Sequence, residues 1–261
     1  DLIWRIALEN LRIRKYDGQE LAALAFVPVE PIMVLLVSHG FRGAKENGGK
    51  IYSFASRLQE LGIAVYAFDF IGSGASDGSF ADITLSRQGD DLAVVMDYAY
   101  NRHQLPLLLL GRSFGGSTVL AGGSKDQRVA GFILWSTPVM LKDCFARIMG
   151  SDYNKLKEGQ AVRFQDEAGE FELNPGFIKD FDLHDMDQYL ATIASRPVLI
   201  VHGKEDEAVD FTNAEYAARQ LPKAQLHLVD QADHRFNGLT KAREDITINW
   251  LREILTRGRG C

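Results

Sequence analysis

The sequence predicts a protein of the α/β class, with an eight-stranded, mostly parallel sheet flanked by helices and a smaller inserted segment. Short apolar runs rich in β-branched residues recur along the chain, the later runs are apolar at nearly every position, and helical patterns separate them. Parallel strands that are buried on both faces have this continuous apolar character. Alternation of strands with helices is typical of a doubly wound sheet, so the three observations point to one architecture.

Eight segments have the length and composition of strands. The first two alternate polar and apolar residues, as an antiparallel ribbon with one solvent-facing side would, whereas the other six match buried parallel strands. The eight segments are residues 5–13, 21–29, 32–38, 63–70, 105–111, 129–136, 197–203 and 224–230.

Helical patterns occupy the connections between the later strands. In the last of them, Ile246, Trp250, Leu251 and Ile254 repeat at helical spacing. The expected helices span residues 48–62, 84–101, 114–124, 212–220 and 238–256. Because ligands of doubly wound sheets bind beyond the carboxyl ends of the strands, functional residues are expected in the loops that follow strands.

One connection, residues 138–194, is longer than a crossover helix requires. It contains VRFQDEAGEFEL at 162–173, which has the pattern of a short hairpin that turns at residues 167–169. An insertion of this size above strand ends is typical of a lid or a cap over a substrate pocket, and a surface excursion without function is the alternative. We therefore expect a single domain over residues 1–261 with a lid at 138–194.

Charge and hydropathy exclude several classes of partner. The chain of 261 residues has a formal net charge of -6 and contains no basic run, so it has no electrostatic footprint for nucleic acid. No apolar stretch approaches the ~20 residues of a membrane span. The N-terminal residues 1–15 alternate polar and apolar side chains, unlike a secretory signal. Since the chain begins with Asp1 and not with Met, removal of an upstream segment is left open.

The two cysteines, Cys144 and Cys261, are too few for a disulfide framework and lack the paired spacing of a zinc site. Cys144 lies in LKDCFARI, an amphipathic helical pattern, and is expected to be an inert, partly buried thiol. These features favour a reducing, cytoplasmic compartment and a protein that needs no metal and no cofactor. A homodimer is compatible with the sequence.

Two segments match the pattern Gly-x-Ser-x-Gly: GRSFG around Ser113 and GASDG around Ser76. A nucleophilic serine of this type needs a sharp turn directly after a buried strand, with a helix that begins behind it. The strand at 105–111 leads into Ser113, and the small residues of GGSTVLAGG follow. Ser76 lies instead in a glycine-rich loop, with Asp77 beside it and no helical pattern behind. Ser113 is therefore the predicted nucleophile.

A serine nucleophile needs a base that accepts its proton. His234 lies in the loop after the last strand and just before the final helix, from which it can reach back to Ser113, so it is the predicted base. His39 and His202 each end a strand and are expected to shape the loops there. The remaining histidines, His103, His184 and His227, have no such position.

The base needs an acid that orients it. Acidic residues crowd the loop after PVLIVHG, namely Glu205, Asp206, Glu207 and Asp210. Asp206 stands at the tip of this turn and is the predicted acid, while Asp210 is its rival. The backbone N–H groups of Phe41, in SHGFRG, and of Phe114, directly after the nucleophile, are the predicted donors to an oxyanion.

Taken together, these motifs resemble the α/β-hydrolase superfamily and, within it, the cinnamoyl and feruloyl esterase group of serine carboxylesterases. The matching segments are HGFRG, DFIGSGASDG, GRSFGG, HGKEDEAV and ADHRF. The resemblance implies a serine esterase whose triad is Ser113, Asp206 and His234, with an inserted lid at 138–194. The chain departs from many relatives at the elbow, where Arg112 replaces a histidine, and at the acid turn, where AVDF replaces a VVP-like segment.

The expected reaction is hydrolysis of a small carboxylic ester through an acyl-enzyme, with hydroxycinnamate esters as the substrates that the resemblance implies. Asp152 and Gln160 in the insertion are candidate contacts for a phenolic hydroxyl, and solvated surface positions are the alternative for both. Another acyl hydrolase with the same triad, such as a monoacylglycerol lipase, a thioesterase or an aminopeptidase, fits the same motifs. A non-catalytic binding module on this fold is the remaining alternative.

Overall fold

A computed structural model describes residues 7–258 of the chain. Residues 5 and 6, at the start of the first expected strand, and Cys261 lie outside this range. Within it, every expected strand is present, and its ends lie within a few residues of the expected ones.

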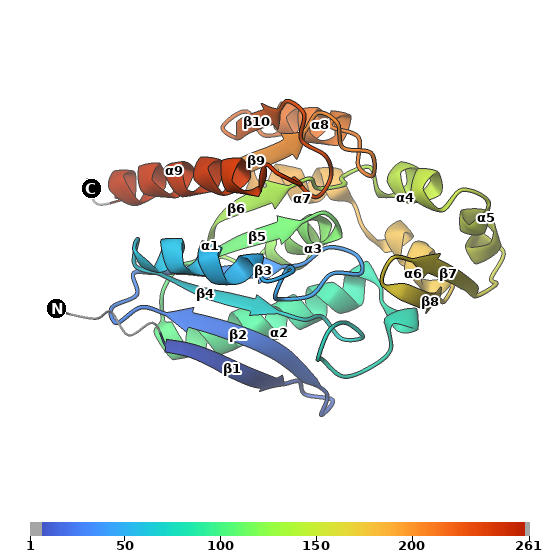
Figure 1. The fold of residues 1–261 in the computed structure, drawn as a ribbon, viewed down its shortest axis with the longest axis horizontal. Helices are drawn as coiled ribbons and strands as arrows, with labels where there is room; N and C mark the ends of the chain where they lie inside the picture. The colour runs from blue at the N-terminus through green and yellow to red at the C-terminus, as the bar shows by residue number, and fades with distance from the viewer. Residues whose placement is uncertain (1–6, 259–261) are drawn as a thin grey trace.

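The eight strands form one mixed sheet in the order β1-β2-β4-β3-β5-β6-β9-β10 (Figure 1). β2 pairs antiparallel with β1 and with β4, and all other pairs are parallel, so the strand directions agree with the prediction. The solvent-facing side expected of the first two segments is wrong for β2, because residues 21–26 are all buried and contribute to the apolar clusters on both faces of the sheet. The strands are β1 (Ala7–Arg14), β2 (Glu20–Val27), β3 (Met33–Ser38), β4 (Ile63–Phe68), β5 (Leu107–Arg112), β6 (Val129–Trp135), β9 (Val198–Gly203) and β10 (Gln225–Val229).

Helices cover both faces of the sheet and give the molecule three layers (Figure 1). One face packs against α1 (Lys50–Gln59) and α9 (Thr240–Gly258). The other packs against α2 (Leu85–His103), α3 (Phe114–Gly123), α7 (Met186–Ile193) and α8 (Thr212–Gln220). The helices expected from the periodic segments are therefore confirmed.

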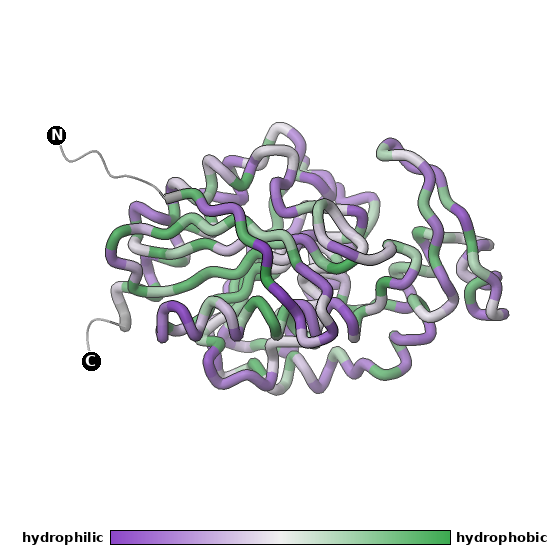
Figure 2. Tube along the Cα trace, turned by 90° about the horizontal axis from the view of Figure 1, so that it is seen from below, coloured by the Kyte–Doolittle hydropathy of each residue, from purple (hydrophilic) through white to green (hydrophobic). Residues whose placement is uncertain are grey.

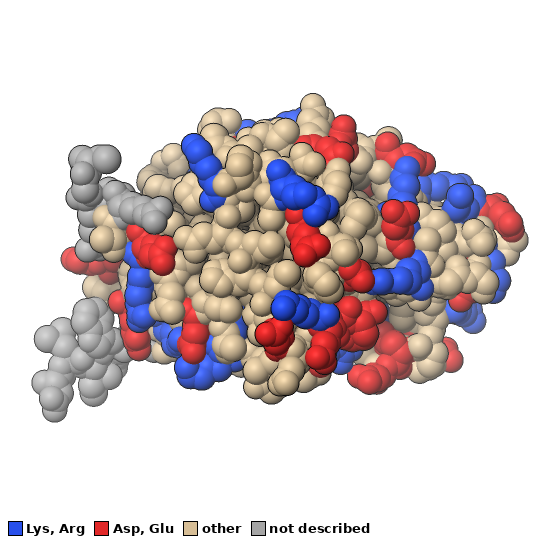
Figure 3. All heavy atoms as spheres, turned by 90° about the horizontal axis from the view of Figure 1, so that it is seen from above, with Lys and Arg blue, Asp and Glu red and all other residues tan. Residues whose placement is uncertain are grey.

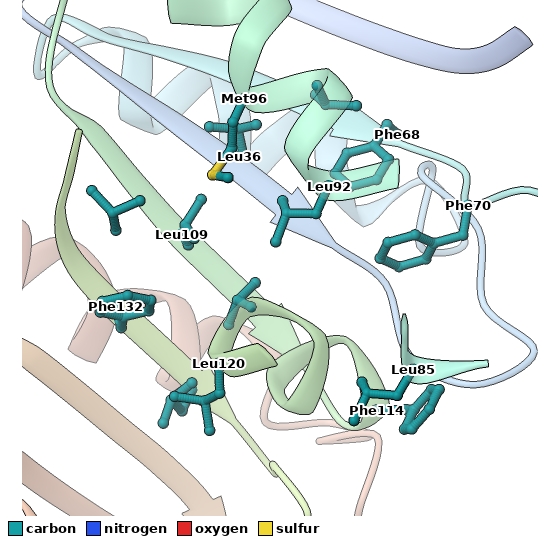
Figure 4. Close-up of a cluster of buried hydrophobic side chains, with 14 of the residues drawn as sticks. Leu36, Phe68, Phe70, Leu85, Leu92, Met96, Leu109, Phe114, Leu120 and Phe132 are labelled. Carbon is teal, nitrogen blue, oxygen red and sulfur yellow. The ribbon is translucent and has the colours of Figure 1, made fainter. Parts of the chain in front are cut away.

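Alternation along the central strands builds a core on each face. Leu107 and Leu109 of β5 belong to the apolar cluster under α2 and α3, whereas Leu108 and Leu110 belong to the cluster under α1 and α9. Figure 4 shows side chains of the first cluster converging from β3, β5 and α2, among them Leu36, Leu109 and Met96. In Figure 2 hydrophobic segments concentrate in the central strands. This double burial explains why the later strands are apolar at nearly every position.

The segment 138–194 lies between β6 and β9 and folds into short elements, most of which lie at the end of the molecule opposite to both termini, whereas α7 lies beside the sheet (Figure 1). The carboxyl ends of the parallel strands point toward this end. The antiparallel hairpin predicted at 162–173 is present. The elements are α4 (Leu141–Met149), α5 (Ser151–Lys157), β7 (Val162–Asp166), β8 (Gly169–Leu173), α6 (Gly176–Lys179), the 3-10 helix η2 (Asp180–Leu183) and α7.

On the side seen in Figure 3, acidic and basic side chains are interspersed. Among the helices of residues 7–258, none combines the length and the apolar character that a membrane crossing requires.

Candidate active site

Ser113 occupies a strained turn between β5, which ends at Arg112, and α3, which begins at Phe114. Its backbone has φ 52° and ψ -127°, a combination that costs on the order of 1–3 kcal/mol for a residue with a side chain. Two hydrogen bonds hold the turn: the Ser113 N–H donates to the Trp135 carbonyl at 2.7 Å, and the Gly116 N–H donates to the Ser113 carbonyl at 2.8 Å. The turn presents the hydroxyl at the carboxyl end of the sheet.

The glycines of GRSFG are required by close backbone contacts. A Cβ atom at Gly115 would lie 2.4 Å from the carbonyl oxygens of Ser38 and His39, and one at Gly111 would lie 2.3 Å from the Gly115 carbonyl oxygen. Helix α3 therefore approaches β3 and β5 more closely than any side chain allows. The five-residue pattern reflects this packing as much as the position of the serine.

The structure brings the three predicted triad residues together. His234 Nε2 lies 3.0 Å from Ser113 Oγ. His234 Nδ1 lies 2.9 Å and 2.8 Å from the two carboxylate oxygens of Asp206. With its Nδ1–H donated to the carboxylate, the imidazole presents an unprotonated Nε2 to the serine hydroxyl, which is the arrangement of a general base.

Asp206 is buried and held as a carboxylate by surrounding donors. The backbone N–H groups of Ala208 and Val209 donate to its Oδ1 at 3.0 Å and 2.7 Å. His202 Nε2 lies 3.1 Å from Oδ2 and 2.8 Å from the Val209 carbonyl oxygen, so its N–H is shared between the two acceptors. Burial by itself would raise the pKa of Asp206, but the hydrogen bonds from His202 and His234 outweigh it and lower that pKa well below its usual range.

His202 contacts Asp206, although its position at a strand end predicted only a role in shaping the loop. It lies at the end of β9, four positions before Asp206, and is fully buried. A histidine at a strand end, shortly before a candidate acid, was the available signal, but its side-chain direction could not be known from spacing.

The other acidic candidates in this loop have different partners. Asp210 accepts hydrogen bonds from the N–H and the hydroxyl of Thr212, at the start of α8, and lies 3.8 Å from Arg147. Glu207 accepts a backbone hydrogen bond from His234 at 3.2 Å, and Glu205 is exposed. Asp206 therefore has the position of the acid, whereas its rival Asp210 binds Thr212 at the start of α8.

His39 and Ser76 both have structural hydrogen bonds. His39 Nδ1 donates to the Gly40 carbonyl at 2.8 Å, and its Nε2 accepts from the Phe70 N–H at 3.2 Å. Burial lowers the pKa of His39 to about 4, so the ring is neutral at pH 7. The Ser76 hydroxyl donates to the Asp69 carbonyl at 2.6 Å and accepts from the Ala22 N–H at 2.8 Å. Both side chains stabilise loops near the strand ends through hydrogen bonds to the backbone.

The two predicted oxyanion donors come from two different segments next to the serine. Phe114 is the first residue of α3, where a helix leaves its N–H groups without intrahelical acceptors. Phe41 follows Gly40, and a Cβ atom at Gly40 would lie 3.6 Å from Ser113 Oγ, so this loop runs directly past the hydroxyl. In the described residues, the Phe41 N–H has no acceptor within the protein. Both N–H groups are thus available to a ligand.

A cavity of about 590 Å³ opens at Ser113 and His234. Its wall comes from the loop after β3, the hairpin turn of the insertion and the loop that carries His234. Asp152 and Gln160 are not in this wall: Asp152 pairs with Lys155 on α5 at 2.7 Å, and Gln160 is exposed. The lining residues are Gly40, Phe41, Arg42, Gly43, Ala44, Asn47, Gly48, Lys50, Arg112, Ser113, Asp166, Glu167, Ala168, His234, Arg235 and Asn237.

Phenylalanines join the insertion to the loop after β3 and to α3. Phe41 and Phe177 have ring centroids 5.5 Å apart, Phe114 and Phe145 5.4 Å, and most pairs meet edge to face, the arrangement that aromatic rings prefer. We call this group the phenylalanine cluster; it comprises Phe41, Phe80, Phe114, Phe145, Phe164, Phe171, Phe177 and Phe181. The insertion thus packs on the loop that carries Phe41.

Two ion pairs connect the hairpin turn to the rim of the cavity. Arg42 binds Asp166 with two hydrogen bonds of 2.9 Å and 3.0 Å, and its guanidinium lies 4.4 Å from the centre of the Phe171 ring. Arg235, next to His234, lies 3.3 Å from Glu167. The pairs are exposed, so each contributes at most about 1 kcal/mol to stability.

Two further observations concern chemistry elsewhere. Cys144 is buried, its sulfur donates to the Asn213 side chain at 3.6 Å, and burial raises the pKa of the thiol, which fits the inert role expected of it. Among residues 7–258, no three His, Cys, Asp or Glu side chains are grouped closely enough to hold a metal ion.

The geometry described above is that of the α/β-hydrolase superfamily, and comparison with known families agrees. Residues 30–167 match the family described as serine aminopeptidase, S33. This match covers more than half of the chain, so the protein belongs to that family.

Two curated relatives extend over most of the chain. The protein YfhR of Salmonella typhi, itself uncharacterized, is 27% identical over 88% of this chain and 74% of its own length. A monoacylglycerol lipase of Mycolicibacterium smegmatis is 25% identical over 76% of this chain and 79% of its own length.

Among solved structures, Est1E of Butyrivibrio proteoclasticus with bound ferulic acid superposes with a TM-score of 0.77. It is 23% identical and the superposition covers 93% of this chain and 99% of that one. At this identity the likeness establishes the α/β-hydrolase fold and leaves the substrate open.

Proposed function

We propose that the protein is a serine esterase that hydrolyses carboxylic esters in two acyl-transfer steps. The observation that carries the proposal is the continuous chain of hydrogen bonds from Ser113 Oγ through His234 to Asp206, at 3.0 Å and 2.8 Å. Its position at a strained turn, beside a cavity and two available N–H groups, supports the same conclusion.

In the first step His234 Nε2 accepts the Ser113 proton while Oγ attacks the ester carbonyl. Asp206 stabilises the imidazolium that forms, and its ionised state is supported by the four donors around it. The N–H groups of Phe41 and Phe114 stabilise the tetrahedral oxyanion, and protonated His234 then gives its proton to the departing alcohol. Water, activated by His234, hydrolyses the acyl-enzyme in the second step.

We further propose that the segment 138–194 acts as a lid. Its hairpin turn supplies Asp166, Glu167 and Ala168 to the cavity wall, and its phenylalanines pack on Phe41. Because the two ion pairs at the hairpin turn are exposed, they can open at little cost and admit substrate.

For the acyl group, aromatic acids of the hydroxycinnamate type are the finer proposal. Phe41 belongs both to the cavity wall and to the phenylalanine cluster, so an aromatic acyl group bound there would meet an aromatic surface. The fold shared with Est1E, which binds ferulic acid, is consistent with this substrate class. The similarity to a monoacylglycerol lipase favours glycerol esters as the second candidate.

A substrate panel tests these proposals. Purified protein is assayed with methyl ferulate, short 4-nitrophenyl esters, a monoacylglycerol, an acyl-CoA and an aminoacyl amide, each beside the Ser113→Ala variant. Ser113-dependent hydrolysis of any carboxylic ester supports the esterase. The rate of hydrolysis of methyl ferulate, compared with that of the monoacylglycerol, decides which acyl group is preferred. Turnover of the thioester or the amide alone would overturn the esterase in favour of a thioesterase or an aminopeptidase.

A further inference from the structure

The wall of the cavity at Ser113 carries more positive charge than its own acidic residues neutralise. Four of its residues are basic and two are acidic. The two acidic residues, Asp166 and Glu167, are already paired with Arg42 and Arg235. Arg112 and Lys50 remain, and in the described part of the chain neither has a carboxylate within ion-pair distance.

Arg112 is the better placed of these two cations. It directly precedes Ser113, so the two Cα atoms are about 3.8 Å apart. Its guanidinium is half-buried and donates one hydrogen bond, of 2.7 Å, to the Asn47 side chain. Arg112 is thus fixed by a neutral partner, and the other N–H groups of its fork are free for a planar anion.

Lys50 and Arg243 add to the positive potential behind Arg112. Lys50, the first residue of α1, lines the same cavity and also a narrower one behind it, which Arg112 and Trp135 share. The guanidinium of Arg243 stacks on the Trp135 ring, 4.1 Å from the ring centre. This guanidinium is fully buried, and none of its three nitrogen atoms has a hydrogen-bond partner among residues 7–258.

Burial and neighbouring arginines disfavour the charged forms of Arg243 and Lys50. Burial, followed by Arg112, lowers the pKa of Arg243 to about 9. Burial, followed by Arg243 and Arg112, lowers the pKa of Lys50. Two acids, Glu244 and Asp233, partly oppose these shifts of the pKa, but Glu244 pairs with Arg57 at 3.3 Å and Asp233 accepts hydrogen bonds from Asn237. A buried cation without an ion-pair partner in the described residues, as Arg243 is, is costly, and an anion that arrives nearby would reduce that cost.

We propose that Arg112 and Lys50 form a subsite for an anionic group of the substrate, so that the preferred esters carry a carboxylate or a phosphate close to the scissile bond. This inference rests on the proposed esterase function and narrows its substrate class. The anion binds in the fork of Arg112, with Lys50 beside it and the potential of Arg243 behind. Binding there positions the ester carbonyl over Ser113 and contributes to discrimination against neutral esters.

Matched pairs of esters test the subsite. On the acyl side, 4-nitrophenyl hydrogen adipate is compared with neutral 4-nitrophenyl hexanoate; on the alcohol side, 4-carboxyphenyl acetate is compared with methyl 4-acetoxybenzoate. For each pair the ratio of kcat/KM, anionic over neutral, is measured after subtraction of spontaneous hydrolysis. Inorganic phosphate and acetate, tested as inhibitors of the neutral ester, distinguish a phosphate from a carboxylate as the preferred anion.

The variants are Arg112→Gln, Arg112→Lys and Lys50→Gln. A control, Arg252→Gln, removes the same charge from an exposed position on α9. In at least one pair the ratio should fall by about tenfold or more in Arg112→Gln, the loss expected for a hydrogen bond between charged groups, and by less in Lys50→Gln. In Arg112→Lys the ratio should fall less than in Arg112→Gln, and in Arg252→Gln it should equal the wild-type ratio. Added salt should lower the wild-type ratio.

An unchanged ratio in both charge-removing variants would overturn the subsite while leaving the esterase intact. Failure of the wild type to hydrolyse all four esters would count instead against the esterase itself. Should Arg112→Gln not fold, Lys50→Gln and the salt dependence still decide the matter, because Lys50 is a surface-accessible residue at a helix start.

Discussion

The surroundings of Ser113 and of Ser76 have the same glycine-flanked pattern but use the serine hydroxyl in opposite ways. At Ser113 the hydroxyl contacts the ring of His234 and otherwise faces a cavity. At Ser76 the hydroxyl bridges two backbone groups, the Asp69 carbonyl and the Ala22 N–H, and so joins the loop after β4 to β2. A hydroxyl whose donor and acceptor are both taken by backbone is part of the scaffold, whereas one held only by a histidine is free to react.

The loop that contains Ser76 also supports the site from a distance. Asp69, buried at its start, accepts hydrogen bonds from the backbone N–H and from the ammonium group of Lys45, both at 2.7 Å. Lys45 belongs to the loop that carries Phe41. The loop that begins at Asp69 therefore helps to fix the position of a predicted oxyanion donor, although its Ser76 takes no part in the proposed chemistry.

Replacement of Ser113 should have the largest effect. Ser113→Ala is expected to lower kcat/KM by up to ~10⁶, because the members of a triad act as a unit. Its melting temperature should stay close to that of the wild type, since the hydroxyl makes one side-chain hydrogen bond. Ester hydrolysis and thermal unfolding, measured on the same preparation, check both parts. Near-normal turnover by this variant would remove the distinction between the two serines.

The second prediction compares two aspartates of one loop. Asp206→Asn should lower kcat by about 10⁴, because an amide in place of the carboxylate no longer holds His234 in the required tautomer. Asp210→Asn, the matched control, should keep turnover within about threefold, since the Asp210 carboxylate binds Thr212 and makes no hydrogen bond to His234 in the described residues. Steady-state kinetics of both variants test this assignment, and a larger loss in Asp210→Asn would reverse it.

A third prediction concerns His39, whose ring, unlike that of His234, is buried. The pKa of His39 falls from 6.5 to about 4 on folding, so between these values the unfolded chain binds the additional proton. Stability is therefore lost as the pH falls through this window, by about 2 kcal/mol at pH 5. His39→Gln should reduce the difference in unfolding free energy between pH 7.5 and pH 5, measured by urea titration. An identical difference in wild type and variant would contradict the neutral, buried ring.

The smallest effect is expected at Ser76. Ser76→Ala should lower the unfolding free energy by about 1–3 kcal/mol, because two partly buried backbone groups lose their partner. Ester hydrolysis should remain near the wild-type rate. The pair Ser113→Ala and Ser76→Ala thus separates activity from stability, and a Ser76→Ala variant that is stable but inactive would argue against the scaffold role.

Much of the fold was predictable because its determinants are local. Double burial makes each parallel strand an apolar run, and the helix at 212–220 was located from its periodicity alone. The order of the strands could not be predicted from the sequence, because β4 lies between β2 and β3 through contacts that no single segment encodes.

For the site, Ser113 and His234 were predictable because a nucleophile at a strand-to-helix turn and a base after the last strand follow from topology. The choice between Asp206 and Asp210 depends on which carboxylate turns inward, and spacing within one loop does not determine that direction. The presence of Arg112 and Lys50 in one cavity wall could not be predicted for a related reason, because only the fold brings residues so far apart in the chain to the same cavity. Asp152 and Gln160 were chosen by their place in the insertion, and the structure puts them outside the cavity wall.

The most direct test of the central claim is covalent labelling with a fluorophosphonate, followed by peptide mapping with mass spectrometry. The reagent reacts with a serine only where a base activates it and an oxyanion site accepts the phosphonyl oxygen. We predict one labelled peptide, containing Ser113, in the wild type and in Ser76→Ala, and no label in Ser113→Ala. A label at Ser76, or a folded wild-type protein that takes up no label, would contradict the account.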